Sequence, residues 1–163
     1  MKNTKPLKNT QSGFMLLEAL IAILIFSFGV LALVALQARS IQLSADAKYR
    51  TNATLLANQL IGQMWVSGEK TPTALKAAFD PSKDAYKSWL AEVKGENGLP
   101  GVMSASSGVV ATLPIVTISD VPGPTLAELG QVTITLFWRT PEMNPGDPGH
   151  RHVVVSQIAI NQP

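Results

Sequence analysis

The sequence contains no cysteine, and this absence removes several kinds of chemistry at once. Without thiols the chain has no disulfide, no thiolate nucleophile and no cysteine ligand for zinc. A domain built from it must therefore be held together by packing and hydrogen bonds. Charged residues are also scarce, at 15% of the chain against a typical value of about 25%.

The sequence also lacks the motifs that accompany common enzyme chemistries. It has no glycine-rich nucleotide-binding motif, and Ser67 and Lys70 match S-x-x-K without a companion motif. His150 and His152 are too few for a metal site, although Glu142 and Asp147 lie nearby. We therefore expect no catalytic residue, no cofactor and no bound metal, and predict that the protein is not an enzyme.

What the chain does have is one long apolar run, residues 14–38, interrupted by a single charge at Glu18. At about 1.5 Å per residue, such a helix is roughly 37 Å long and can cross a bilayer core of about 30 Å. Lys2, Lys5 and Lys8 precede it with no acidic residue among them. Positive charge ahead of a span predicts a cytoplasmic N-terminus and an outward-facing remainder.

The basic character of the chain resides in this short leader. The formal net charge is +2, yet the leader supplies three of the 13 Lys and Arg residues and none of the 11 Asp and Glu residues. Without it, ten basic residues face eleven acidic ones, a net charge of −1. This balance argues against a nucleic-acid-binding surface, so we expect no nucleic acid among the partners.

Glu18 needs an explanation, because a carboxylate inside a span costs about 2.5–3.5 kcal/mol at mid-bilayer. One interpretation is interfacial: Glu18 lies near the start of the helix, where it reaches headgroup water and the positive end of the helix dipole. The other is functional, with a cationic partner in another molecule. Position within the run does not decide between them.

The residues around Glu18 favour the functional interpretation. A short basic leader, the Gly13–Phe14 junction, three more apolar residues and Glu18 together resemble the class III leader of type IV pilins and pseudopilins, G-F-x-x-x-E. The resemblance implies that a prepilin peptidase cuts between Gly13 and Phe14. It further implies N-methylation of Phe14 and a role for Glu18 in subunit assembly.

Within that family, the helix sequence is similar to the type IV pilus modification protein PilV group of minor pilins, whose pattern is matched from Gly29 to Gln37. The resemblance implies a subunit held in the inner membrane, with its head in the periplasm, that later enters a pilus tip or initiation complex. Implied partners are the prepilin peptidase, other minor pilins, the major pilin and the pilus assembly platform. Alternatives are a minor pseudopilin of a type II secretion system and a signal-anchored periplasmic binding domain.

Past the apolar run the helical pattern becomes amphipathic and continues to a stop at Gly68. The sequence thus divides into a leader (1–13), a membrane or filament-core half-helix (14–38), an amphipathic half-helix (39–67) and a globular head (68–163). The predicted buried stripe consists of Ala45, Tyr49, Ala53, Leu56, Leu60 and Met64, widened by Leu55, Ile61 and Trp65.

The head is predicted to hold short helices in residues 71–95 and antiparallel strands in residues 101–160. Asp80 is expected to cap a helix that has Pro81 in its first turn. Alternating patterns predict strands at 113–119, 131–139 and 151–160, with a further one possible at 102–106. Trp65, Trp89 and Trp138 are expected in the core. The predicted fold is α+β and pilin-like, a long N-terminal helix packed on a small antiparallel sheet.

Overall fold

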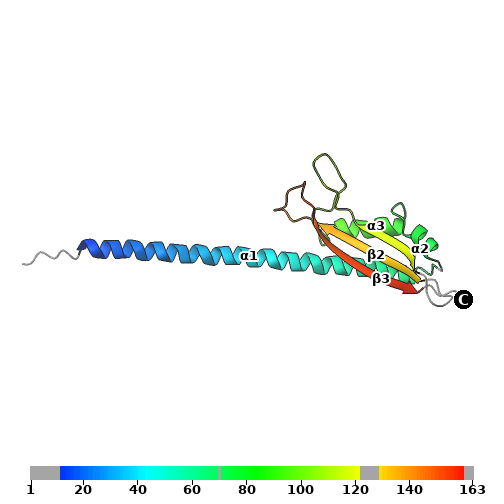
Figure 1. The fold of residues 1–163 in the computed structure, drawn as a ribbon, viewed down its shortest axis with the longest axis horizontal. Helices are drawn as coiled ribbons and strands as arrows, with labels where there is room; N and C mark the ends of the chain where they lie inside the picture. The colour runs from blue at the N-terminus through cyan, green and yellow to red at the C-terminus, as the bar shows by residue number, and fades with distance from the viewer. Residues whose placement is uncertain (1–11, 70, 122–128, 160–163) are drawn as a thin grey trace, which may run out of the picture. The chain divides into compact units, whose positions relative to one another are not determined.

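The computed structural model describes residues 12–69, 71–121 and 129–159. Within these residues three helices precede three strands, and Figure 1 shows how they are arranged. The helices are α1 (Ser12–Val66), α2 (Pro72–Ala78) and α3 (Asp84–Lys94), and the strands are β1 (Ile115–Val121), β2 (Leu129–Trp138) and β3 (His150–Ala159). The α+β architecture predicted from the sequence is confirmed. The leader, apart from Ser12 and Gly13, lies outside the described residues.

The chain divides into two compact units, Met1–Ala45 and Asp46–Pro163, and α1 contributes to both. In the first unit the described residues are all helical, and the apolar side chains of residues 14–38 are exposed. The helix is unbroken at Gly29. In the second unit, the remainder of α1 packs with the other elements.

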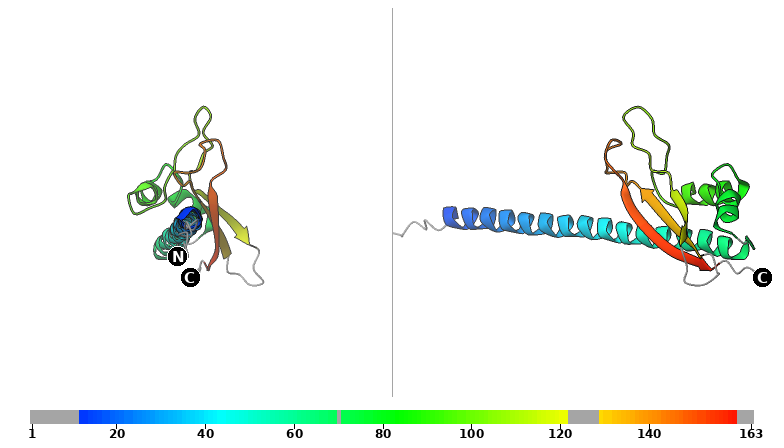
Figure 2. Two further views of the ribbon diagram at one scale, coloured as in Figure 1. Left: turned by 90° about the vertical axis from the view of Figure 1, so that its left-hand side faces the viewer. Right: turned by 45° about the vertical axis from the view of Figure 1, so that its right-hand side comes forward.

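The second unit is built on an antiparallel sheet in the order β1-β2-β3. Ile115 lies opposite Thr135 and Trp138 opposite His150, so consecutive strands pair along their length. Figures 1 and 2 show the three strands crossing the second-unit part of α1, with α3 beside them. The alternation of β2 puts Val132, Ile134, Leu136 and Trp138 on the buried face, as predicted.

The core joins this face of the sheet to one side of α1 and to the short helices. Trp89, at the centre, is fully buried, and its indole nitrogen donates to the carbonyl of Leu56 at 2.8 Å. Each large apolar side chain taken out of water contributes about 1.5–3 kcal/mol, which lets the unit do without disulfides. The buried apolar side chains are Ala53, Ala57, Leu60, Ile61, Met64, Leu75, Phe79, Tyr86, Trp89, Val93, Leu99, Val132, Ile134, Leu136, Trp138 and Ile158.

Two positions expected in the core are on the surface instead. Leu55 is 62% exposed and Trp65 is 51% exposed, because both lie on the side of α1 turned away from the sheet. The predicted stripe was therefore too wide. Trp89 and Trp138, in contrast, are buried as expected.

The helix ends are determined by capping hydrogen bonds and backbone conformation, and one predicted cap is wrong. Gly68 ends α1 with a φ of +71°, a left-handed conformation that favours glycine. Thr71 caps α2 by accepting a hydrogen bond from the Ala74 amide at 3.1 Å. The cap predicted at Asp80 is wrong, because its carboxylate accepts from the amide and hydroxyl of Ser82 in a turn, and α3 begins only at Asp84.

The predicted strand at 102–106 is also absent from the described part of the chain. That segment is a loop with an isolated bridge between Ser106 and Val109. The Leu99-Pro100-Gly101 turn brings the loop against the end of β2, where the Arg139 amide donates to the Pro100 carbonyl at 2.9 Å. Gly101 allows this approach through its φ of +66°.

Candidate functional site

The strongest candidate site is the start of α1. Phe14 and Glu18 are one helical turn apart, and with Leu17 and Ile21 they line a shallow groove on one helix face. Both side chains are exposed. The structure thus brings Phe14 and Glu18 together, while Gly13 is helical and precedes them directly. An amine created on Phe14 would lie one turn from the Glu18 carboxylate of its own helix.

This site belongs to the one described helix that is long and apolar enough to cross a membrane. Its most apolar 18-residue window has a mean hydropathy of 2.9 and is not buried within the protein. Within residues 14–38 Glu18 is the sole ionisable side chain. A lone carboxylate in such a segment favours the functional interpretation, because a partner would remove the cost of leaving it unpaired.

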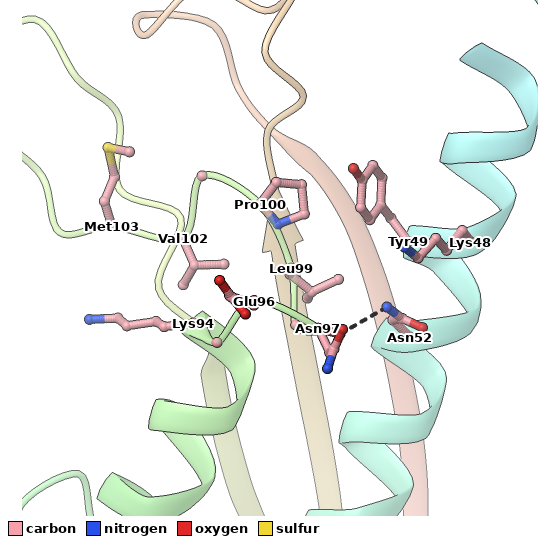
Figure 3. A pocket seen from close by; sticks show the side chains of 13 residues that line it. Lys48, Tyr49, Asn52, Lys94, Glu96, Asn97, Leu99, Pro100, Val102 and Met103 are labelled. Atoms are coloured by element: carbon pink, nitrogen blue, oxygen red, sulfur yellow. Dashed lines mark hydrogen bonds between the residues drawn. The ribbon is translucent and has the colours of Figure 1, made fainter. Parts of the chain in front are cut away.

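The second unit contains a separate cleft of about 420 Å³ between α1 and the end of α3. Figure 3 shows Asn97 turned toward α1, where the Asn52 amide donates to the Asn97 carbonyl at 3.1 Å. The Lys94 side chain extends away from α1 in the same view. Lys48, Tyr49 and Asn52 line one wall, and residues 94–103 line the other.

The cleft owes its shape to a tight backbone reversal after α3. The Leu99 amide donates to the Val93 carbonyl at 2.8 Å, which ends the helix. Any side chain at Gly98 would clash with the same carbonyl, so this position requires glycine. The cleft combines one exposed carboxylate, Glu96, with amides and dispersed lysines, an arrangement without a nucleophile–base pair among its lining residues.

The two histidines considered as metal ligands contact α1. Nε2 of His152 lies 3.0 Å from the Thr54 hydroxyl, which itself donates to the Arg50 carbonyl. His150 stacks on Trp138 at 5.6 Å, and its Nε2 lies 3.9 Å from Asp46. These contacts attach β3 to α1.

The loop that precedes β3 holds Glu142 and Asp147, the two acidic residues near the histidines. Asn144 donates to the Asp147 carboxylate at 3.2 Å, and the Asp147 amide donates to the Asn144 carbonyl at 3.0 Å, so the loop closes on itself. No group of three or more His, Asp or Glu side chains suited to a metal occurs in residues 12–69, 71–121 and 129–159. Ser67, the start of the S-x-x-K match, donates to the Met64 carbonyl, and Lys70 lies outside the described residues.

Arg139 is a buried charged residue that the sequence did not indicate. Arg139 is only 6% exposed, and its Nη2 donates to the carbonyls of Val110 and Asp147 at 3.2 and 2.9 Å. Its Nε and Nη1 have no partner among the described residues. An arginine at the end of an alternating strand is expected to face solvent, so no sequence signal pointed to its burial.

Comparisons with protein-family models, curated proteins and solved structures gave no match to this chain. The assignment of function therefore depends on the residues and the fold described above.

Proposed function

We propose that this protein is a minor pilin, a subunit made as a leader-bearing precursor and incorporated into a type IV pilus. The observation that carries the proposal is the pairing of Phe14 and Glu18, one turn apart at the exposed start of a helix able to cross a membrane. The small antiparallel sheet packed on the second part of that helix also suits a pilus subunit. The role is structural and non-enzymatic.

In this proposal the leader is removed by a prepilin peptidase between Gly13 and Phe14, and the new amine on Phe14 is methylated. The mature subunit stays in the inner membrane through residues 14–38, with its head in the periplasm. It then joins other minor pilins and the major pilin at a tip or initiation complex, with the help of the pilus assembly platform.

Glu18 would then set the register between neighbouring helices. An unpaired carboxylate in the apolar segment is costly, and so is an unpaired amine. If Glu18 of one subunit meets the Phe14 amine of another, both charges are compensated by a charge-assisted hydrogen bond. A helix inserted out of register leaves both charges unpaired. The pair therefore stabilises only one position of the helix along its neighbour.

The first test is mass spectrometry of the N-terminus, on protein from cells with and without the prepilin peptidase. We expect the mature chain to begin at N-methyl-Phe14, and this form to disappear without the peptidase. A chain that keeps Met1, or one that begins near Arg39 or Lys48, would exclude the pilin assignment and favour a signal-anchored or secreted periplasmic domain.

The second test separates processing from assembly. Glu18→Ala should still be cut at Gly13 but should be lost from sheared filaments, because the neighbour's amine has no partner. Glu18→Asp keeps the charge on a shorter side chain and should recover part of the incorporation. Glu69→Ala, a carboxylate just after α1, is the matched control and should be incorporated normally. Normal incorporation of Glu18→Ala would show that the interfacial interpretation is correct.

The pseudopilin alternative makes the same predictions for processing and for Glu18. It differs in the assembly that is affected, because loss of a type II pseudopilin stops secretion of folded exoproteins and leaves pili intact. Deletion of this chain, followed by parallel assays of surface pili and of secretion, distinguishes the two systems.

A further inference from the structure

Arg139 is a buried cation without a counter-ion in the described part of the chain. Its side chain is only 6% exposed, although arginine is almost never fully buried unless it is paired. In residues 12–69, 71–121 and 129–159, no Asp or Glu side chain forms an ion pair with it. The fold therefore takes a positive charge out of water without supplying the negative charge that usually accompanies it.

The guanidinium of Arg139 also has more donors than the described residues satisfy. Nη2 donates to the carbonyls of Val110 and Asp147, whereas Nε and Nη1 are buried without a partner among the described residues. Buried donors that have no protein partner in a native fold are usually satisfied by water or by an ion. Both carbonyls are neutral, and so is water, so only an anion would compensate the charge as well as the donors.

Two largely exposed loops meet over this guanidinium. They are residues 101–114, before β1, and residues 139–149, between β2 and β3, and Figures 1 and 2 show both projecting from the same end of the sheet. The Val110 amide donates to the Pro145 carbonyl at 3.1 Å, and a Cβ built on Gly146 would lie 3.7 Å from the Gly108 carbonyl oxygen. Arg139 adds a second bond between the loops by donating to Val110, so the guanidinium itself helps to hold its cover closed.

We propose that Arg139 binds an oxyanion, a phosphate or a carboxylate, between these two loops. A guanidinium offers two pairs of parallel donors, Nε with Nη2 and Nη1 with Nη2, and either pair fits two oxygens of such an anion. In Arg139 each pair combines an unpartnered nitrogen with Nη2, which is bonded to the loops. An anion held by two bonds therefore displaces the carbonyl of Val110 or of Asp147. Both residues are exposed, so water can hydrate the released carbonyl, and binding loosens the cover.

This inference does not depend on leader cleavage, on membrane anchoring or on pilus assembly. All the residues concerned lie in the second unit. The oxyanion site can therefore fail while the proposed function holds, or the reverse.

The test is a titration of the full chain in non-ionic detergent micelles with sodium phosphate or sodium acetate, against sodium chloride at the same ionic strength. We expect phosphate or acetate to shift the amide resonances of Val110 and Asp147 saturably, because one of their carbonyls leaves the guanidinium. Chloride lacks the two oxygens and should not produce these shifts. At about ten times its dissociation constant, the bound anion should raise the melting temperature of the second unit by about 5 °C.

Three variants assign the response to the guanidinium. Arg139→Met should abolish the saturable shifts, and Arg139→Lys, which keeps the charge but lacks parallel donors, should bind about tenfold more weakly. Arg151→Met removes an exposed arginine of β3 and is the matched control, with binding as in the unaltered protein. Equal shifts in Arg139→Met, or equal shifts with chloride, would overturn the proposal. The absence of a saturable shift with both phosphate and acetate would show that Arg139 is no oxyanion site.

Discussion

At the scale of single residues, burial changes the chemistry of Tyr86. Its ring is buried against Trp89 at 5.6 Å, and its hydroxyl donates to the Pro114 carbonyl at 3.2 Å. Burial raises the pKa of Tyr86 above the ordinary value of 10.0, because the phenolate would lose its hydration. The hydroxyl thus joins α3 to the start of β1 only while it keeps its proton.

This shift predicts how stability depends on pH. Below about pH 10 both states of Tyr86 are protonated, so its stabilising effect is constant; above it the unfolded state ionises first and the folded state is disfavoured. Tyr86→Phe should lower stability by about 1 kcal/mol at neutral pH and make the decline above pH 10 shallower. Melting temperatures between pH 8 and pH 11 measure both effects.

The chain offers one matched control, since Tyr49 is its other tyrosine. Tyr49 is half-buried at the edge of the cleft. Tyr49→Phe should leave the alkaline decline as steep as in the unaltered protein. An equal change in both variants, or none in Tyr86→Phe, would show that other groups control the alkaline limit.

The sequence predicted the burial of some side chains correctly and of others wrongly. Trp89 and Trp138 lie in patterns with polar neighbours, so their burial was predicted correctly. Trp65 lies in residues 51–68, which contain no charged residue, so the sequence does not show which face of the helix is exposed. Its predicted burial in the core was therefore wrong. Arg139 was missed for a tertiary reason, since two loops distant in sequence close over it.

At the scale of elements, Arg139 connects two loops that would otherwise be held by few contacts. Its guanidinium bonds to Val110 in one loop and to Asp147 in the other. The Val110 amide also donates to the Pro145 carbonyl at 3.1 Å. Hydrogen bonds from a charged group contribute about 1.5–3 kcal/mol each, while each buried donor without a partner costs about 1–3 kcal/mol. The two satisfied bonds and the two unsatisfied donors therefore nearly offset each other.

This balance predicts a local effect when the guanidinium is removed. Arg139→Met should leave the melting temperature nearly unchanged but increase amide hydrogen exchange in both loops, near Val110 and near Asp147. Arg151→Met alters an exposed arginine on β3 and should change neither quantity. A large fall in melting temperature with unchanged loop exchange would mean that Arg139 stabilises the core instead of the loops.

Element type was the most predictable feature of the fold, and element ends were less so. The period of two in β2 and of 3.6 in the amphipathic part of α1 arises from burial on one face, which a sequence records directly. The start of α3 was misplaced because Asp80 can cap a turn or a helix with the same hydrogen bonds, and here Ser82 takes them. The pairing of Phe14 and Glu18 followed from spacing alone.

At the scale of the whole molecule, the two units are stabilised in different ways. The second unit depends on a buried core, whereas the helix of the first unit buries no side chain within the protein. In an apolar medium a helix keeps its hydrogen bonds, because breaking one leaves polar groups without water. A span and a water-exposed domain should therefore not melt together.

We expect heating in micelles to abolish the near-ultraviolet circular dichroism of the buried tryptophans while a substantial helical far-ultraviolet signal remains. Trp89→Phe loses a bond to Leu56 and core volume, and should lower the near-ultraviolet midpoint by about 4 °C or more. Trp65→Phe changes a half-exposed ring and should cost at most about 0.5 kcal/mol. Neither variant should alter the residual helical signal, since neither lies in residues 14–38. Simultaneous loss of both signals would mean that the apolar half of α1 depends on the second unit for its structure.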